Sequence, residues 1–215
     1  GILQGDRYRM DVELKNNAIS HLTTQGATRI YKMDSNYATH MVTLNLKDNS
    51  YLEFIPEQII PYKNSRFYQK TNLEIDDSST VVYSETIVPG RIAMGEMFDF
   101  DVCYLKTEGK INGKIKFRDT SLLTPKTQKI QALTMFDDKT ILTSVYVLTK
   151  KDVTKINDLI NELFSHTQNM SGGSSVMPNN SGISIRILGN SSEDQKITIY
   201  EILKIIRKEI LPDYL

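Results

Sequence analysis

Hydrophobic and polar residues alternate from residue 7 to about residue 149, as in Tyr8, Met10, Val12 and Leu14. When hydrophobic residues recur at every second position, their side chains all lie on one face of a β-strand and the polar side chains on the other. Most of the chain is therefore expected to be β-structure. We predict eleven strands here, over residues 8–14, 18–23, 29–32, 40–46, 51–55, 65–75, 80–87, 97–106, 114–117, 130–135 and 141–148.

Clusters of turn-forming residues separate these strands, at residues 15–17, 47–50, 76–79 and 137–139. Asn112-Gly113 suits the two-residue turn of a tight β-hairpin. Many short strands at this spacing are typical of a sandwich, a barrel or a β-solenoid. Because no repeat of fixed length is visible, the pattern alone does not choose among the three.

The spacing of hydrophobic residues becomes helical near Asp152, which is placed to cap a helix that reaches Phe164. Residues 168–180, rich in Gly, Ser and Asn, are expected to form a mobile loop before a strand at 183–188. A capping box at 192–195 opens a second helix that ends before Pro212. We predict one domain over residues 1–215, with a β-rich part (1–150) and a helix-strand-helix part (151–215) packed on it.

Composition excludes several classes of function. The 215 residues carry 26 Lys and Arg and 26 Asp and Glu, so no net charge attracts nucleic acid or an anionic membrane. Cys103 is the only cysteine, which excludes an internal disulfide framework and a cysteine-based zinc site. A lone cysteine fits a reducing compartment, and no apolar run approaches the roughly 20 residues of a spanning helix. We therefore expect a cytoplasmic protein without nucleic-acid or membrane partners.

The chain begins with Gly1, and the alternating pattern starts almost at once. We expect the sequence to begin inside the first sheet of a longer protein.

Charged residues stand inside strand-like sequence at Glu85, Arg91 and Glu96. One interpretation is an internal salt-bridge network that stabilises a strand-turn-strand corner. A second is a β-scaffold hydrolase in which Glu85 and Glu96 form the acid pair. A third is a water-filled passage, because carboxylates without His or Cys bind a borderline cation weakly enough to release it.

Other candidate groups give weaker signals. His21, His40 and His166 lack partners at metal-ligand spacing, and Cys103 lies on an alternating segment as a small core residue. No nucleophile elbow or nucleotide-binding glycine motif is present. The segment with Thr24, Gln25 and Thr28 provides hydroxyl and amide groups without charge, either as a polar turn or as a hydrogen-bonded β corner.

Four segments carry a family resemblance, at residues 1–7, 22–31, 52–62 and 89–98. In this order they resemble the UreD family of urease accessory proteins, called UreH in some bacteria. The resemblance runs from residue 1 to about residue 210. Family members normally have further strands ahead of Gly1, and the sequence after residue 210 differs from their usual basic, proline-containing ending.

This resemblance implies a mainly β fold of β-helical, solenoid-like type with a few helices. It also implies a maturation factor and no enzyme: such proteins bind apo-urease and UreF, UreF recruits the GTPase UreG, and Ni²⁺ passes to the urease active site. No tightly bound cofactor is expected, only Ni²⁺ in transit.

The resemblance places the acidic positions of the family on Asp6, Glu53, Glu85 and Glu96. We predict that these four carboxylates line a transient nickel path. From charge balance, Arg91 is the predicted counter-charge that keeps the path from holding metal too tightly.

Overall fold

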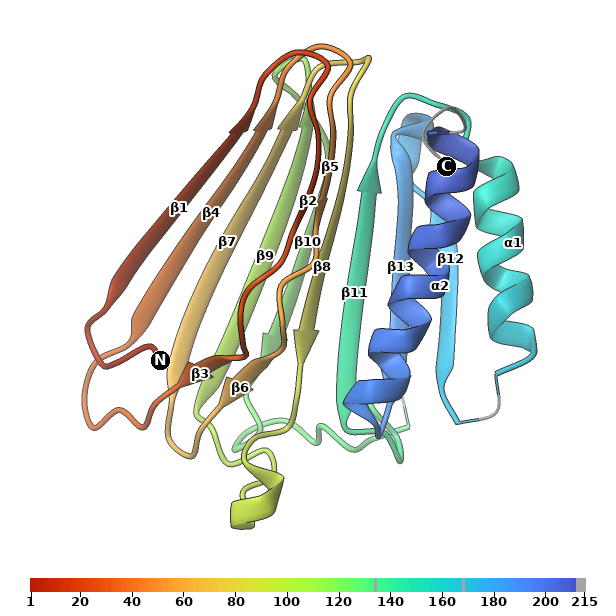
Figure 1. Ribbon diagram of the computed structural model, residues 1–215. Coiled ribbons are helices and arrows are strands. Elements are labelled where there is room, and N and C mark those ends of the chain that lie inside the picture. The colour runs from red at the N-terminus through yellow and green to blue at the C-terminus, as the bar shows by residue number, and fades with distance from the viewer. Residues whose placement is uncertain (134, 168, 212–215) are drawn as a thin grey trace.

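The computed structural model describes residues 1–133, 135–167 and 169–211. The strands form two facing sheets that follow successive coils of the chain (Figure 1). The first sheet has the order β1-β4-β7-β9-β10, with bounds β1 Arg7–Leu14, β4 Ala38–Leu46, β7 Arg66–Ile75, β9 Val102–Ile111 and β10 Lys114–Leu123. The second has the order β12-β13-β11-β8-β5-β2, with bounds β2 Ile19–Leu22, β5 Tyr51–Phe54, β8 Thr80–Ile87, β11 Ile141–Leu148, β12 Ser171–Val176 and β13 Gly182–Gly189.

Successive coils stack in parallel: β1 on β4, β4 on β7 and β7 on β9 in one sheet, and β2 on β5 and β5 on β8 in the other. Short strands β3 (Thr28–Ile30) and β6 (Ile59–Pro61) pair in the same way. The predicted mainly β, solenoid-like fold is therefore confirmed. Partners in successive coils are separated by 32, 29 and 36 residues, which explains why no fixed repeat is visible in the sequence.

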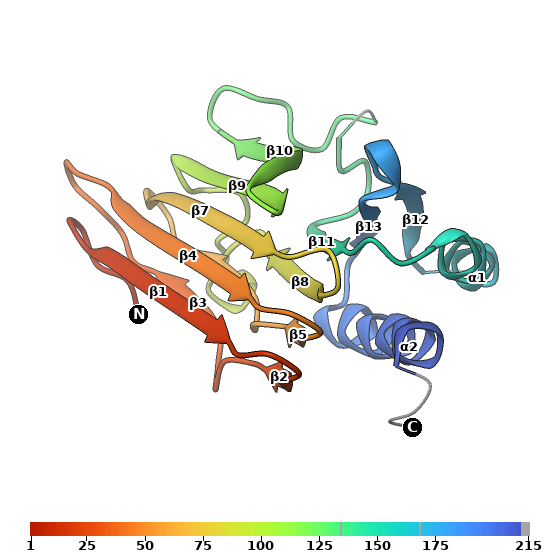
Figure 2. The same ribbon diagram turned by 90° about the horizontal axis from the view of Figure 1, so that it is seen from above.

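The solenoid ends in antiparallel strands. β11 pairs with β8 and β13, and β13 pairs with β12. Two helices, α1 (Thr154–Ser165) and α2 (Ser192–Ile210), cover the outer face of these strands (Figures 1 and 2). Their apolar stripes pack against outward-facing residues of the strands in one cluster, which includes Ile160, Ile202, Val145 and Ile185. Within the described residues, no helix has the length and hydrophobicity needed to cross a bilayer.

Local signals account for several boundaries. Asn112 and Gly113 have φ values of 48° and 72°, so the predicted hairpin turn between β9 and β10 is confirmed. Asp152 accepts hydrogen bonds from Thr154 at the start of α1. The cap of α2 is Ser191, one residue before the predicted capping box, because its hydroxyl accepts the N–H of Asp194. The predicted end of this helix at Pro212 lies outside the described residues.

One loop prediction and two strand predictions were wrong. Residues 171–176, predicted as loop, form β12, where Gly172 leaves room for the ring of Phe164 from α1; a Cβ there would lie 2.3 Å from that ring. Of the strand predicted at 130–135, residue 134 lies outside the described residues and the others form turns. The strand predicted at 97–106 begins only at Val102, because the preceding segment forms a loop with the 3₁₀ turn η1 (Ile92–Met94).

Candidate functional site

The second sheet is interrupted beside β8. Phe54 of β5 pairs with Tyr83, and the next pair joins Ile59 of β6 to Ile87. The loop of residues 55–58 lies between these pairs, and the preceding coil makes the same interruption between β2 and β3 with residues 23–27. Residues 84–86 of β8 therefore have no strand partner on this side of the sheet.

Thr24 and Thr28 connect the two stacked loops. The Thr24 hydroxyl donates to the Gly26 carbonyl at 3.2 Å and accepts the N–H of Glu57 at 3.0 Å. The N–H of Thr28 donates to the carbonyl of Gln58 at 2.9 Å. This segment is a polar turn that also joins two coils by hydrogen bonds, so both interpretations of its sequence describe part of it.

A cavity of about 50 Å³ lies between the sheets at this interruption. This volume has room for a few water molecules. The wall is mostly apolar, and its polar residues come from both sheets and both loops: Thr24, Thr28, His40, Glu57, Gln69, Tyr83, Glu85 and Thr86. The sequence candidates Thr24, Thr28 and Glu85 therefore meet at one place, whereas Gln25 is exposed and does not line the cavity.

Glu85 is the buried carboxylate of this cavity, with 4% of its surface exposed. Tyr83 donates to its Oε2 at 3.2 Å, and the Tyr146 hydroxyl lies 3.3 Å from its Oε1. The Tyr83 hydroxyl is itself fixed, since it accepts hydrogen bonds from Gln69 and Thr71. Only hydroxyl groups hydrogen-bond to Glu85 among the described residues, and no cationic side chain does.

Burial raises the pKa of the Glu85 carboxyl to about 7, although hydrogen bonds from Tyr83 and the charge of Arg186 act in the opposite direction. A carboxyl group with this pKa exchanges its proton near neutral pH. Burial also lowers the pKa of His40, which favours the neutral imidazole at the same cavity. Glu85 and His40 can therefore both bind a cation when they are unprotonated.

A polar chain leaves the cavity on the far side of Glu85. Tyr146 donates to Asp119 Oδ2 at 2.6 Å, a shorter contact than the one to Glu85, and Asp119 pairs with Arg186 of β13. A phenol has one proton, so when Tyr146 donates it to Asp119 its oxygen is free to accept a hydrogen bond from the protonated carboxyl of Glu85. Asp119, Tyr146 and Arg186 line an open hollow of about 260 Å³.

A second open hollow, of about 190 Å³, lies on the outer side of the interruption near the start of α2. It shares Pro56, Glu57 and Thr86 with the cavity wall. Glu57 Oε1 pairs with Lys196 Nζ of α2 at 2.6 Å. A partly exposed ion pair therefore lies where the hollow and the cavity meet, and Glu57 lines both.

Glu53 is in a different setting, although it is also buried, with 1% exposed. Arg207 of α2 donates to both of its oxygens, at 2.7 and 2.5 Å. The Tyr51 hydroxyl donates to Oε1 and His21 Nδ1 lies against Oε2, each at 2.7 Å. Burial opposes ionisation, but the hydrogen bonds from Arg207, His21 and Tyr51 prevail and lower the pKa of Glu53.

Glu96 and Arg91 pair with each other in the loop before β9. One edge of the Arg91 guanidinium, formed by Nε and Nη2, binds both oxygens of the Glu96 carboxylate, and the guanidinium lies 4.1 Å from the centre of the Tyr62 ring. This hydrogen bonding by Arg91 lowers the pKa of Glu96. Gly90 has φ of 138°, and a Cβ there would lie 3.0 Å from the Glu96 carbonyl, so the tight loop requires glycine.

The structure thus brings Glu85 to the cavity and leaves the other three predicted nickel residues away from its wall. Asp6 lies in an N-terminal turn, where its Oδ2 accepts the N–H of Leu3 at 2.7 Å. Arg91 pairs with Glu96 and not with Glu85. The predicted salt-bridge network is therefore limited to Arg91 and Glu96 in the loop before β9 and does not include Glu85. The hydrolase interpretation expects Glu85 and Glu96 to share a cleft. Glu96 does not line the cavity that Glu85 lines, so the geometry does not favour that interpretation.

Within the described ranges, no group of three or more His, Cys, Asp and Glu side chains is arranged to hold a metal ion. Sequence reasoning did not select Glu57, His40 and Tyr146, of which the first two line the cavity together with Glu85 and the third hydrogen-bonds to it. Glu57 lies in the segment 52–62 that carries the family resemblance, so that motif could have indicated it as a candidate site residue. The other two come from strands far away in the sequence and gave no local signal.

These features define a solenoid-like β scaffold with a small, mostly apolar cavity inside it, whose wall includes one buried carboxylate and a few other polar side chains. The model of a family described as UreD urease accessory protein matches residues 1–213. The chain belongs to this UreD family.

Curated relatives agree with this assignment. The chain is 37% identical over 195 residues to the urease accessory protein UreD of Cenarchaeum symbiosum, covering 90% of this chain and 68% of the relative. It is 34% identical over 214 residues to UreD 2 of Brucella suis, covering 98% and 71%. It is 37% identical over 169 residues to UreD of Staphylococcus aureus, covering 79% and 61%.

Proposed function

We propose that this protein is a urease maturation factor that acts as a scaffold and catalyses no reaction. In this proposal it binds apo-urease and UreF in the cytoplasm, UreF recruits the GTPase UreG, and Ni²⁺ is passed to the urease active site. Membership of the UreD family and the names of the relatives, which are accessory proteins, support this role.

The observation that carries the nickel part of the proposal is the position of Glu85. It is a buried carboxylate beside a cavity at a break in the sheet, with an open hollow on each side. Glu57 lies at one entrance, and Tyr146 and Asp119 lead to the other hollow. Such a series of oxygen groups suits a cation that must move on and not stay.

The chemistry of the proposed passage follows from the unpaired state of Glu85. Because no cationic side chain hydrogen-bonds to it in the described structure, an arriving divalent ion does not have to displace one. The ion stabilises the ionised carboxylate and releases the proton that burial favours. His40 offers a neutral imidazole nitrogen to the same ion, and the hydroxyl groups of Thr24 and Thr28 replace part of its hydration shell.

Of the four residues predicted for the nickel path, we now assign the contact with the ion to Glu85. Glu53 and Glu96 are engaged by arginines, and Asp6 closes a turn, so a passing ion would have to break those interactions first. We assign these three residues to the stability of the scaffold. In this proposal the few polar groups at the cavity wall, and not Arg91, set how weakly the ion is held.

The scaffold role is tested with the purified chain, UreF and apo-urease. We expect the three to co-elute in size-exclusion chromatography, and we expect urease activity to appear when UreG, GTP, bicarbonate and Ni²⁺ are added. Separate elution of all three proteins would remove the scaffold role. If the three proteins co-elute but urease is activated equally well without this chain, the scaffold role stands and the proposed role in nickel delivery is removed.

A further inference from the structure

The outer face of the first sheet is an uncovered surface in the described part of the chain. Both helices lie on the second sheet, and Figures 1 and 2 show no helix over β1, β4, β7, β9 and β10. The strand register defines which residues share this outer face, because alternate residues point away from the core.

Aromatic side chains gather at one end of this face. Tyr68 of β7 and Tyr104 of β9 are in register, with ring centres 5.8 Å apart, and Leu122 of β10 continues the same row. Tyr37, directly before β4, packs edge-on against Tyr68 at 5.2 Å. We call Tyr37, Tyr68, Tyr104 and Leu122 the tyrosine row. Tyr37, Tyr68 and Leu122 remain 44%, 37% and 45% exposed.

The next row along the strands is basic. It contains Met41 of β4, which is 42% exposed, followed by Lys70 of β7 and Lys106 of β9. Neither lysine forms an ion pair with any residue that the structure describes. In a chain with no net charge, these two lysines form a local excess of positive charge beside exposed apolar surface.

The rows beyond the lysines are electrically balanced and provide a contrast. Lys110 pairs with Glu74 at 2.9 Å, and Arg118 pairs with Glu108 at 2.5 Å. Cross-strand neighbours of opposite charge are the usual arrangement on an exposed sheet. Glu108 stands in the row next to the lysines, and Arg118 is the main cause of its lowered pKa, with a weaker contribution from the charge of Lys70. Because Arg118 binds this carboxylate, Lys70 and Lys106 have no ion-pair partner of their own among the described residues.

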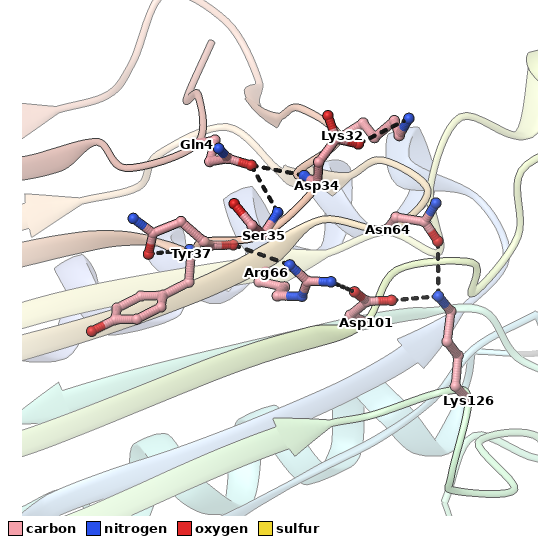
Figure 3. A network of polar contacts seen from close by, with 10 residues as sticks. Gln4, Lys32, Asp34, Ser35, Tyr37, Asn64, Arg66, Asp101 and Lys126 are labelled. Carbon is pink, nitrogen blue, oxygen red and sulfur yellow. Dashed lines mark hydrogen bonds and ion pairs between the residues drawn. The ribbon is translucent and has the colours of Figure 1, made fainter.

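The loops beside the tyrosine row are held in place before any partner arrives (Figure 3). Arg66 pairs with Asp101 at 2.7 Å and also donates to the carbonyl of Asn36, the residue before Tyr37. Lys126 binds Asp101 and the Asn64 side chain from the far side. The guanidinium of Arg7 lies 4.5 Å from the centre of the Tyr37 ring. A surface fixed in this way loses little conformational entropy when it is buried.

We infer that the tyrosine row and the two lysines form a docking surface for a partner protein that presents carboxylates around apolar side chains. Fixed tyrosines are typical of the residues that dominate binding energy, and unpaired lysines beside them are complementary to acidic groups. Single-stranded nucleic acid is the other polymer that combines negative charge with flat rings. It fits less well, because the tyrosines pack edge-on or tilted against each other and the chain has no net positive charge.

This inference rests on the proposed function, which supplies the two probes, purified UreF and purified apo-urease. Their affinities for the full chain are measured by biolayer interferometry for the wild type, Lys70→Glu/Lys106→Glu and Tyr68→Ala. We expect each variant to bind one of the two probes at least about tenfold more weakly. We also expect wild-type binding to that probe to weaken between about 50 mM and about 300 mM NaCl.

Two control variants separate this role from a structural one. Lys70→Arg/Lys106→Arg keeps the charges and should bind as the wild type does. Lys150→Glu/Lys208→Glu reverses two exposed lysines elsewhere and should also leave binding unchanged. Melting temperatures, measured for every variant, identify any that fail to fold.

The inference is overturned if the folded charge-reversal variant binds both probes within about twofold of the wild type. It is also overturned if the reversal changes only the binding of a labelled single-stranded RNA oligonucleotide. If the wild type binds neither probe, the proposed function itself fails and the inference falls with it.

Discussion

Glu53 and Glu85 are buried carboxylates on the neighbouring parallel strands β5 and β8, and they have opposite environments. Glu53 faces α2, where Arg207, Tyr51 and His21 satisfy both of its oxygens. Glu85 faces the interior, where hydroxyl groups surround it and a cavity lies open beside it. The pKa of Glu53 is lowered, whereas burial raises the pKa of Glu85 to about 7.

The difference shows that burial of a charged residue does not by itself indicate a functional site. A buried carboxylate with a bidentate arginine already has its counter-charge, and it contributes to the packing of a helix on a sheet. A buried carboxylate without one has a large cost of ionisation that an incoming cation can relieve.

Removal of the partner of Glu53 should have the largest effect. Arg207→Met leaves an uncompensated buried carboxylate, so we expect a loss of about 3 kcal/mol or more in the free energy of unfolding. Urea denaturation at pH 7 measures it. The double variant Arg207→Met/Glu53→Gln should recover much of this loss. An equal loss in the single and double variants would contradict the ion-pair account.

The pH dependence of stability should differ between the wild type and Glu85→Gln. The folded pKa of Glu85, about 7, lies above that of an unfolded glutamate. The folded state therefore holds the proton more tightly, and stability falls as the pH rises from about 4.5 to about 7. Relative to Glu85→Gln, the wild type should lose up to about 3 kcal/mol over this range. Parallel unfolding free energies of the two proteins from pH 5 to pH 8 would refute the raised pKa.

Tyr83→Phe should have an intermediate effect. It removes a hydroxyl group that donates to Glu85 and accepts from Gln69 and Thr71. Because buried donors are then left without partners, we expect a loss of about 2 kcal/mol. We also expect the pKa of Glu85 to rise further, as followed by carboxyl ¹³C NMR. An unchanged pKa would show that Tyr83 does not hydrogen-bond to the ionised carboxylate.

The smallest effect should come from the Arg91–Glu96 pair, which is partly exposed to solvent. Glu96→Gln should lower the free energy of unfolding by about 1 kcal/mol or less, because exposed ion pairs are worth little. The loss should diminish further in high salt. A loss as large as that of Arg207→Met would show that this loop, and not the interface of α2, depends most on its ion pair.

The sequence alone predicted the β-rich part of this fold well, because alternation is a local property of each strand. It failed at β12, which is made mostly of Gly and Ser in place of the usual strand formers, and where Gly172 leaves room for Phe164. It also failed at residues 130–133, where buried Ile130 lies in a turn and not in a strand. In both places a contact with another element decides the local structure.

The candidate site could be predicted only in part. The sequence identified Glu85, Thr24 and Thr28, but it could not distinguish Glu85 from Glu53. The residue that neutralises Glu53 is Arg207, 154 positions away in the chain. Such a pairing is decided by how α2 crosses the sheet, and no local pattern around Glu53 contains that information.

The most direct test of the central claim is the activation of apo-urease by reconstituted complexes that carry Glu85→Gln or the matched pair Glu53→Gln/Arg207→Gln. Both variants remove buried charge, but only Glu85→Gln removes the carboxylate at the cavity. At equal amounts of folded complex, we predict that Glu85→Gln lowers the nickel content and activity of urease at least about tenfold, equivalent to about 1.4 kcal/mol. The paired variant should activate urease as the wild type does. Full activation with Glu85→Gln would contradict the claim that Glu85 is the carboxylate used in nickel transfer.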